Sequence, residues 1–163
     1  MVSGPDFCRE MRRGEEEAVD ALLRLAFDGE DEVRLVHALR QGREIAGEMV
    51  LPWSRTGIAG YYALSRFVQP KGWLCLAPVA IHPDLQRQRN GRRMIGMLTE
   101  WAWITGTYAV VLGQPAFYEK CGFSVARASA LTSPYPLSHT MLAGPADDAP
   151  KETLIYPKAF DGL

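Results

Sequence analysis

The chain has 163 residues, of which 47% are apolar and 23% charged, and these values suit a single domain over residues 1–163. Its apolar runs are shorter than the roughly 18 residues of a membrane span, and its first residues lack the apolar centre of a signal peptide. We therefore expect a cytoplasmic protein with no membrane partner. A net charge of -1 argues against general attraction to nucleic acid, and three scattered cysteines without a CxxC pair argue against a disulfide framework or a metal site.

The first half of the chain predicts two helices followed by a strand meander. Apolar residues at helical spacing indicate a helix over residues 15–27 and a shorter one over 32–40. Residues 48–53 and 58–67 are typical of two strands joined by a tight turn. The next apolar run, residues 73–81, predicts a central strand that is buried on both faces.

Pro78 lies inside this predicted central strand, where proline is unusual because it has no N–H to donate to a neighbouring strand. We therefore expect the strand pairing to break near Pro78. Backbone N–H groups left unpaired by such a break need a ligand, a water or a bulge as their partner. The break is the first indication of a functional site.

The second half of the chain predicts alternating helices and strands. In order, these are a helix over 91–104, a strand over 109–112, a short helix over 116–120, a strand over 123–128, and possible strands over 140–143 and 153–156. A strand meander followed by βαβ units implies a mixed α/β sheet with flanking helices.

A basic segment, QRQRNGRR over residues 86–93, connects the central strand to the helix that follows it. The start of a helix presents free N–H groups and the positive end of the helix dipole, and four arginines add full charges. The segment predicts a site for a phosphate-bearing ligand; the alternative is a solvated arginine surface. It is neither a Walker loop nor a GxGxxG fingerprint, because no GK[ST] follows and Gly91 is its only glycine.

Two segments resemble motifs of the GNAT family of N-acetyltransferases. APVAIHPDLQRQRNGRRMIGML, residues 77–98, resembles motif A, in which a strand leads into a pyrophosphate-binding loop and a helix. PAFYEKCGF, residues 115–123, resembles motif B, in which a tyrosine stands four residues before a Gly-Phe pair. The resemblance covers roughly residues 7–128, and the tail, with YPLSHTMLA and YPKAF, is similar to one bacterial subgroup of small acetyltransferases. It implies a mixed, largely antiparallel sheet with a splayed central strand pair and flanking helices.

The resemblance also implies which residues bind acetyl-CoA, the acyl donor of the family. Val79, Ala80 and Ile81 would bind the pantetheine arm through backbone hydrogen bonds. The pyrophosphate would lie against the loop and the helix start, namely Gln86, Arg87, Gln88, Arg89, Asn90, Gly91 and Arg92. Arg89 stands where the motif has its first glycine, with Asn90 beside it in place of an apolar residue. Arg89 would either narrow the phosphate site or add a charged contact to it.

For catalysis, the resemblance makes Tyr118 the general acid that protonates the departing thiolate; the alternative is a tyrosine that only packs against its aromatic neighbours. A backbone N–H near Ala80 or Ile81 would polarise the thioester oxygen. Several side chains are open candidates for a general base, namely Glu48, His82, Asp84 and Glu119. His82 also fits a structural role, and Cys121 fits core packing better than a covalent acyl-cysteine route.

The function implied is transfer of an acetyl or other acyl group from acetyl-CoA to a small-molecule or peptide amine. The amine would attack the thioester directly in a ternary complex, without a metal. Two alternatives stay open. One is a non-catalytic module of the same fold that binds acyl-CoA or regulates, and the other is a nucleic-acid-binding protein that uses the arginine cluster. A homodimer is compatible with the apolar tail.

Overall fold

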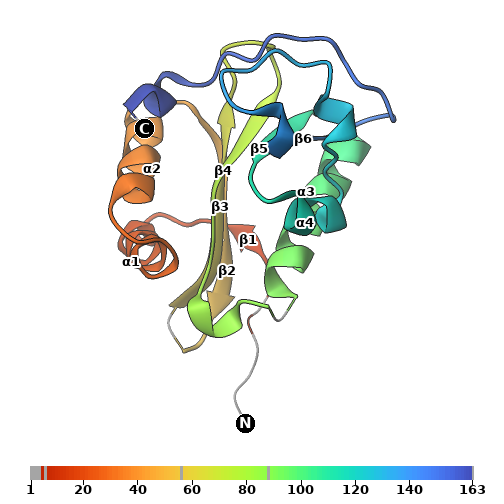
Figure 1. Ribbon diagram of the computed structural model, residues 1–163. Coiled ribbons are helices and arrows are strands. Elements are labelled where there is room, and N and C mark those ends of the chain that lie inside the picture. Colours follow the sequence, from red (N-terminus) through yellow and green to blue (C-terminus); the bar gives the residue numbers. More distant parts are fainter. Residues whose placement is uncertain (1–4, 6, 56, 88, 163) are drawn as a thin grey trace.

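The computed structural model describes residues 5, 7–55, 57–87 and 89–162, and it is built around a six-stranded sheet in the order β1-β2-β3-β4-β5-β6 (Figure 1). The strands are β1 (Arg9–Glu10), β2 (Ile45–Trp53), β3 (Gly57–Arg66), β4 (Leu74–Ile81), β5 (Ala109–Leu112) and β6 (Thr140–Ala143). Neighbouring strands are antiparallel except β4 and β5, which are parallel. The expectation of a mixed, largely antiparallel sheet is confirmed.

Helices cover both faces of this sheet. Helices α1 (Glu16–Ala26) and α2 (Asp31–Gln41) pack on one face, and α3 (Asn90–Thr105) and the short α4 (Pro115–Tyr118) lie on the other (Figure 1). The helical periodicity predicted the three long helices to within a few residues, because each buries one apolar stripe against the sheet. Among the described residues, no helix combines the length and apolar character that crossing a bilayer requires.

Two of the expected strands do not form. After an isolated bridge between Ser124 and Leu142, the predicted strand 123–128 turns into a 3-10 helix at Ala126–Ala128. The Ser124 hydroxyl accepts a hydrogen bond from the Arg127 N–H at 3.2 Å and so favours the turn. Residues 153–156 form only isolated bridges, which include one between Gln69 and Ile155. The C-terminal segment crosses the end of the sheet from β6 to α2 (Figure 1), where Phe160 packs with Leu35.

The predicted break near Pro78 is confirmed. The parallel ladder between β4 and β5 ends where Leu76 lies opposite Val111. Strand β4 continues along β3 as far as Ile81, with a register irregularity opposite Ala77 and Pro78. Beyond Leu76, therefore, β4 keeps a neighbour on one side only, and a gap opens between β4 and β5.

An ion pair joins α2 to the sheet on the α1 and α2 face. The Arg40 guanidinium donates to Glu48 Oε1 from Nε at 3.0 Å and from Nη2 at 2.8 Å, and the Tyr61 hydroxyl donates to the same oxygen at 2.6 Å. Burial and the adjacent Glu48 charge both raise the pKa of Tyr61 well above its ordinary value, so the phenol stays a donor. The Glu48 side chain is only 12% exposed. Its loss would leave Arg40 unpaired in a largely dry environment.

We expect Glu48→Gln to lower the free energy of unfolding by about 1–3 kcal/mol, because the neutral amide cannot replace a carboxylate that accepts three hydrogen bonds. Urea unfolding measures the change. Glu30→Gln is the matched control, since Glu30 pairs with Arg24 at 2.6 Å while both side chains stay about half exposed. Equal losses in the two variants would contradict a structural role for the buried pair.

Candidate active site

A cavity of about 650 Å³ lies where β4 separates from β5, and we call it the central cavity. Residues 75–79 of β4 form one wall, and residues 112–114 together with Phe117 and Tyr118 form the wall across the gap. A third wall comes from the α1 and α2 face and the C-terminal part of the chain. Because α2 and α4 lie on opposite faces of the sheet (Figure 1), the cavity connects the two faces.

Tyr118 stands at the end of α4 and lines the central cavity. Its ring packs edge-to-face against Phe117 and Phe123, with centroid separations of 4.9 and 5.9 Å. Gly113 makes room for this ring, because a Cβ at that position would lie 2.5 Å from Tyr118 Cε2. Burial, followed by the influence of Cys121, raises the pKa of Tyr118 to about 12. Tyr118 is therefore a protonated donor throughout the neutral range.

The segment between β4 and α3 is held in shape by local hydrogen bonds. The Gln86 side-chain amide donates to the carbonyl of Ile81 at 3.1 Å and ties the loop to the end of β4. Arg87 and Arg89 both have left-handed backbone conformations, with φ of 67° and 65°. Glycine adopts such angles without a side-chain penalty, which gives a physical reason for a glycine at the position of Arg89 in the motif. Gln88 lies outside the described residues.

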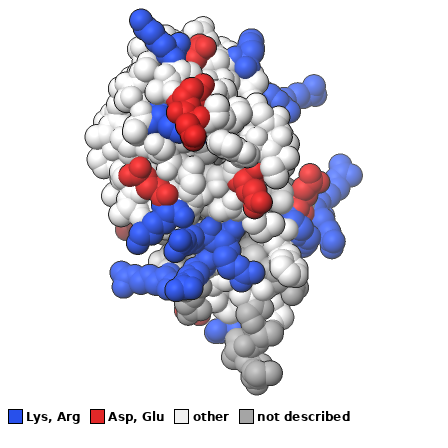
Figure 2. All heavy atoms as spheres, turned by 90° about the vertical axis from the view of Figure 1, so that its right-hand side faces the viewer, with Lys and Arg blue, Asp and Glu red and all other residues white. Residues whose placement is uncertain are grey.

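The start of α3 presents free N–H groups. The first helical hydrogen bond runs from the N–H of Arg93 to the carbonyl of Arg89 at 2.9 Å, so the N–H groups of Asn90, Gly91 and Arg92 precede it. No side chain of the described residues caps this helix. Four exposed arginines surround it, namely Arg87, Arg89, Arg92 and Arg93. Figure 2 shows basic side chains gathered in the lower half of this face, at the level where α3 begins in Figure 1. The arrangement suits a phosphate group.

None of the four candidate bases lines the central cavity. Glu48 is held in its ion pair with Arg40. His82 Nδ1 accepts from the N–H of Asp84 at 3.1 Å, and its ring lies edge-on to Trp53 at 5.3 Å, which supports the structural alternative. Asp84 forms an ion pair with Arg55 at 3.5 Å, and Glu119 is exposed.

Cys121 is a core residue, as expected. Its side chain is 4% exposed, its thiol lies 3.4 Å from the carbonyl of Phe117, and burial raises its pKa. A thiol in these surroundings is a poor nucleophile. Within the described part of the chain, no group of three or more His, Cys, Asp or Glu side chains could hold a metal ion.

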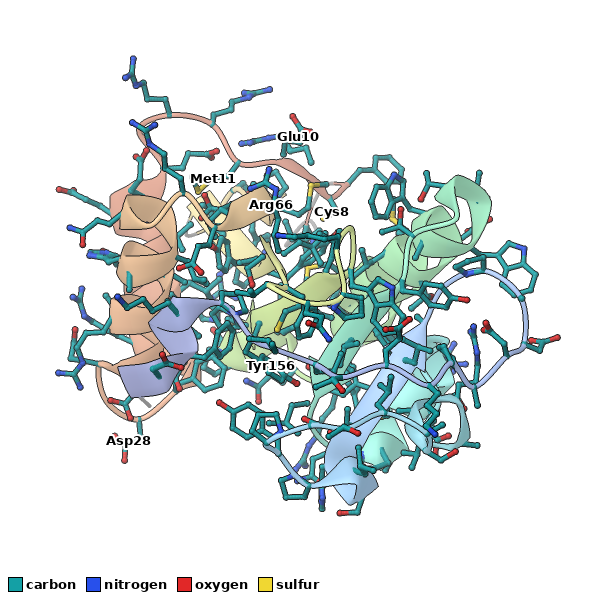
Figure 3. All side chains as sticks on the ribbon, turned by 90° about the horizontal axis from the view of Figure 1, so that it is seen from above. Cys8, Glu10, Met11, Asp28, Arg66 and Tyr156 are labelled. Atoms are coloured by element: carbon teal, nitrogen blue, oxygen red, sulfur yellow. The ribbon has the colours of Figure 1, made fainter. Side chains whose placement is uncertain are left out.

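The sequence suggested that the second helix and the C-terminal segment from Leu131 onward shape the acceptor pocket, but it did not predict which side chains form the third wall of the central cavity. This wall contains Phe27, Glu32 and Leu35 from α1, α2 and their connection, together with aromatic side chains of residues 135, 156 and 160. Figure 3, viewed from above, shows Tyr156 on the C-terminal segment near the middle of the molecule. For Glu32, the available signal was its spacing of three residues from the buried Leu35, which places both on one face of α2.

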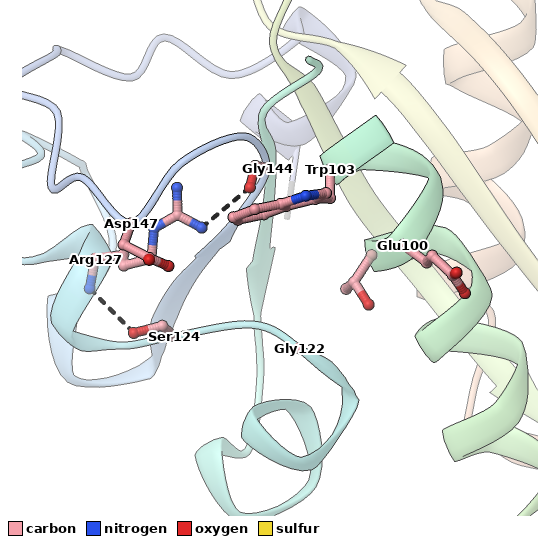
Figure 4. A pocket seen from close by; sticks show the side chains of 8 residues that line it. Glu100, Trp103, Gly122, Ser124, Arg127, Gly144 and Asp147 are labelled. Atoms are coloured by element: carbon pink, nitrogen blue, oxygen red, sulfur yellow. Dashed lines mark hydrogen bonds between the residues drawn. The ribbon is translucent and has the colours of Figure 1, made fainter. Parts of the chain in front are cut away.

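A second hollow, of about 530 Å³, lies between α3 and the loop that follows β6 (Figure 4). Arg127 is its only cation among the described residues. The Arg127 guanidinium donates to the carbonyls of Gly144, Pro145 and Asp148 and to the Asp148 carboxylate. The guanidinium therefore stabilises this loop through these hydrogen bonds.

Comparison with known proteins places this geometry in a class. A family model described as an acetyltransferase (GNAT) domain matches residues 46–125. The chain is 30% identical over 126 residues to the uncharacterized N-acetyltransferase YhbS of Escherichia coli K12, covering 72% of this chain and 73% of that protein. It is 36% identical over 74 residues to the glucosamine 6-phosphate N-acetyltransferase of Schizosaccharomyces pombe, covering 42% of this chain and 66% of that protein.

Solved structures agree. The structure of E. coli YhbS in complex with CoA has a TM-score of 0.84 at 26% identity and covers 99% of this chain and 96% of that one. A GNAT-family acetyltransferase from Brucella melitensis in complex with acetyl-CoA has a TM-score of 0.73 at 22% identity, with 95% and 97% covered, and shows the shared fold. Fold and site thus define an acetyltransferase-class protein. The chain belongs to the GNAT family.

The left-handed conformation of Arg89 gives a prediction about stability. Arg89→Gly should raise the free energy of unfolding by about 0.5–1 kcal/mol, because glycine relieves the backbone penalty at φ 65°. Arg89→Ala is the control, since it removes the same charge but keeps the Cβ. Thermal unfolding of both variants measures the difference. If the alanine variant gained as much as the glycine variant, charge rather than backbone conformation would be the cause.

Proposed function

We propose that the protein transfers an acetyl group from acetyl-CoA to a primary amine, with both substrates bound in the central cavity. The observation that carries this proposal is the separation of β4 from β5 beyond Leu76, with Tyr118 facing the opening and an uncapped helix start close by. The gap can hold a thioester, Tyr118 can donate a proton to its sulfur leaving group, and the helix start can bind a pyrophosphate.

The start of α3 is assigned to the pyrophosphate. The backbone N–H groups of Asn90, Gly91 and Arg92 donate to it, and the exposed arginines add charge-assisted contacts. Gln86 supports the loop through its hydrogen bond to Ile81. Gln88, which lies outside the described residues, stays a predicted member of this site. Phe117 borders this region, because a Cβ on Gly91 would lie 3.3 Å from Phe117 Cζ.

The free edge of β4 is assigned to the pantetheine arm. The N–H of His82 donates to the carbonyl of Ala59 on β3 at 2.7 Å. Because backbone groups alternate along an antiparallel strand, Ala80 then faces β3, while Val79 and Ile81 face the gap. Of the three predicted residues, Val79 and Ile81 are thus the ones proposed to bond the arm.

The chemistry follows from the same alternation. Pro78 has no N–H, so the first N–H directed into the gap beyond the break is that of Val79, which also lines the central cavity. We assign this N–H, in place of the one expected near Ala80 or Ile81, to the thioester oxygen, which becomes negative when the amine nitrogen attacks the carbonyl carbon. As the carbon–sulfur bond breaks, Tyr118 donates to the sulfur. The proton lost by the amine nitrogen replaces the one that the phenol supplies.

Two further predictions concern the surroundings of the protein. A cytosolic location is supported by its three cysteines, which are all free in the structure. A homodimer is supported by the exposed apolar side chains of α3, of which Met97 and Trp103 are each 54% exposed. Neither prediction bears on the chemistry.

The coenzyme site is tested by calorimetric titration with acetyl-CoA and with CoA, with ATP and NAD as comparators. We expect saturable micromolar binding of the two coenzyme A species. Gly91→Glu should weaken it at least tenfold, because it places bulk and negative charge at the helix start. Gly96→Glu is the control on the same helix, where an added Cβ meets no atom within 4 Å. Equal affinity in the wild type and the Gly91 variant would show that the phosphate binds elsewhere.

The acid role is tested by Tyr118→Phe. We expect kcat with any accepted amine to fall about 10- to 100-fold while the Kd for acetyl-CoA stays within twofold, because the hydroxyl acts on the leaving sulfur. Tyr108→Phe is the control, since that hydroxyl bonds Asp148 away from the cavity. Because the acid form of Tyr118 persists to a pKa of about 12, kcat of the wild type should not decline between pH 8 and 10.

Unchanged turnover in the Tyr118 variant would remove this residue from the mechanism. Coenzyme binding with no turnover of any amine would favour the alternative of a non-catalytic acyl-CoA-binding module. Arg89, which stands where the motif has a glycine, is the observation that favours this alternative.

A further inference from the structure

The α2 side of the central cavity holds one carboxylate. Glu32 lies in the first turn of α2, is partly buried, and is the only charged side chain among the described residues that line the cavity. It forms no hydrogen bond or ion pair with any described residue. The neighbouring acids are engaged elsewhere, since Glu30 pairs with Arg24 and Asp31 with Arg34. A carboxylate that lines a cavity and has no partner in the protein is available to a cationic group of a ligand.

Aromatic side chains line the same cavity as this carboxylate. They are Phe27, Tyr135, Tyr156 and Phe160. The rings of Tyr135 and Phe160 lie 4.9 and 5.4 Å from that of Tyr156. Such a wall binds flat or bulky apolar groups and also favours an ammonium near its ring faces.

The Tyr156 hydroxyl is a second polar group without a partner. Tyr156 is 9% exposed, and its hydroxyl has no hydrogen-bond partner among the described residues. The Ser133 hydroxyl lies near enough to lower the pKa of this phenol slightly, although burial dominates and raises it. Buried hydroxyls usually have a partner, and a polar ligand atom that reached this hydroxyl would supply one beside Ser133.

We propose that the acceptor is a primary amine carried on an aromatic or bulky apolar body, and that Glu32 binds its ammonium group while the aromatic wall binds the body. This inference rests on the proposed function and names its second substrate. Glu32 is a specificity residue here. It selects an acceptor that arrives as an ammonium. This ammonium releases one proton to water before its nitrogen attacks the thioester carbon, while the Val79 N–H on β4 and Tyr118 across the gap act on the thioester.

The same charge excludes phosphorylated acceptors. The described lining of the cavity contains no Lys, Arg or His side chain to bind a phosphate, and Glu32 would repel one. The cavity therefore does not suit glucosamine 6-phosphate, after which the S. pombe relative is named.

The test uses four probes with the full-length protein and acetyl-CoA: phenethylamine, spermidine, glucosamine 6-phosphate and, as a neutral inhibitor, 2-phenylethanol. We expect kcat/KM to be highest for phenethylamine. Glu32→Gln should raise KM for phenethylamine at least tenfold and leave kcat within about threefold, because a charge-assisted contact to the substrate is lost. Inhibition by 2-phenylethanol, which carries no charge, should not change in this variant.

Glu17→Gln is the matched control, because Glu17 also lies in the first turn of an 11-residue helix but is exposed and outside the cavity. It should leave KM and kcat unchanged. Tyr156→Phe gives a second readout: the free protein should be at least as stable as the wild type, because an unpartnered buried hydroxyl is removed, while KM for phenethylamine rises.

An unchanged KM in Glu32→Gln, or a preference for glucosamine 6-phosphate or spermidine, would overturn the assignment of Glu32 while the Tyr118-dependent turnover still stood. Binding of phenethylamine to the CoA-loaded protein, followed by calorimetry, reports on Glu32 without turnover, and no binding would equally overturn it. Failure of the proposed function looks different, since acetyl-CoA would then either not bind or bind without Tyr118-dependent turnover of any amine.

Discussion

The arrangement of the site depends on one missing strand partner. Pro78 cannot donate to β5, and the β4–β5 ladder stops at Leu76 opposite Val111. In a fully paired sheet, the backbone N–H and C=O groups of residues 79–81 that face the gap would form hydrogen bonds with the strand next to β4. Because the ladder stops, β4 has a free edge in the middle of the molecule, and a cavity that connects both faces of the sheet can form there.

The two ends of the proposed site carry opposite charge. The α3 end combines unpaired N–H groups with exposed arginines, which suits the phosphates of a coenzyme. The α2 end carries Glu32 among aromatic rings, which suits an ammonium. Each substrate is thereby favoured at its own end and disfavoured at the other, although the net charge of the chain is only -1.

Sequence reasoning located one half of this site better than the other. Pro78, the basic segment and the motif around Tyr118 are local sequence signals. They predicted the strand break, the phosphate site at the helix start and the candidate acid, respectively. Glu32 sits in an acidic run that resembles a solvated surface, and only the docking of α2 decides which carboxylate turns inward. Tyr156 and Phe160 reach the cavity through a C-terminal segment held by isolated bridges and packing, which local periodicity does not encode.

The short ladder between β4 and β5 also has a mechanical consequence. Among the described residues, the direct backbone link between the two parts of the sheet runs through residues 74–76 and 108–111, so the line between them is where small opening motions should concentrate. A molecule lodged along that line makes contacts to both sides and restricts those motions. Whichever substrate binds first would thus lower the entropy that the second must lose, so positive cooperativity between the two is expected.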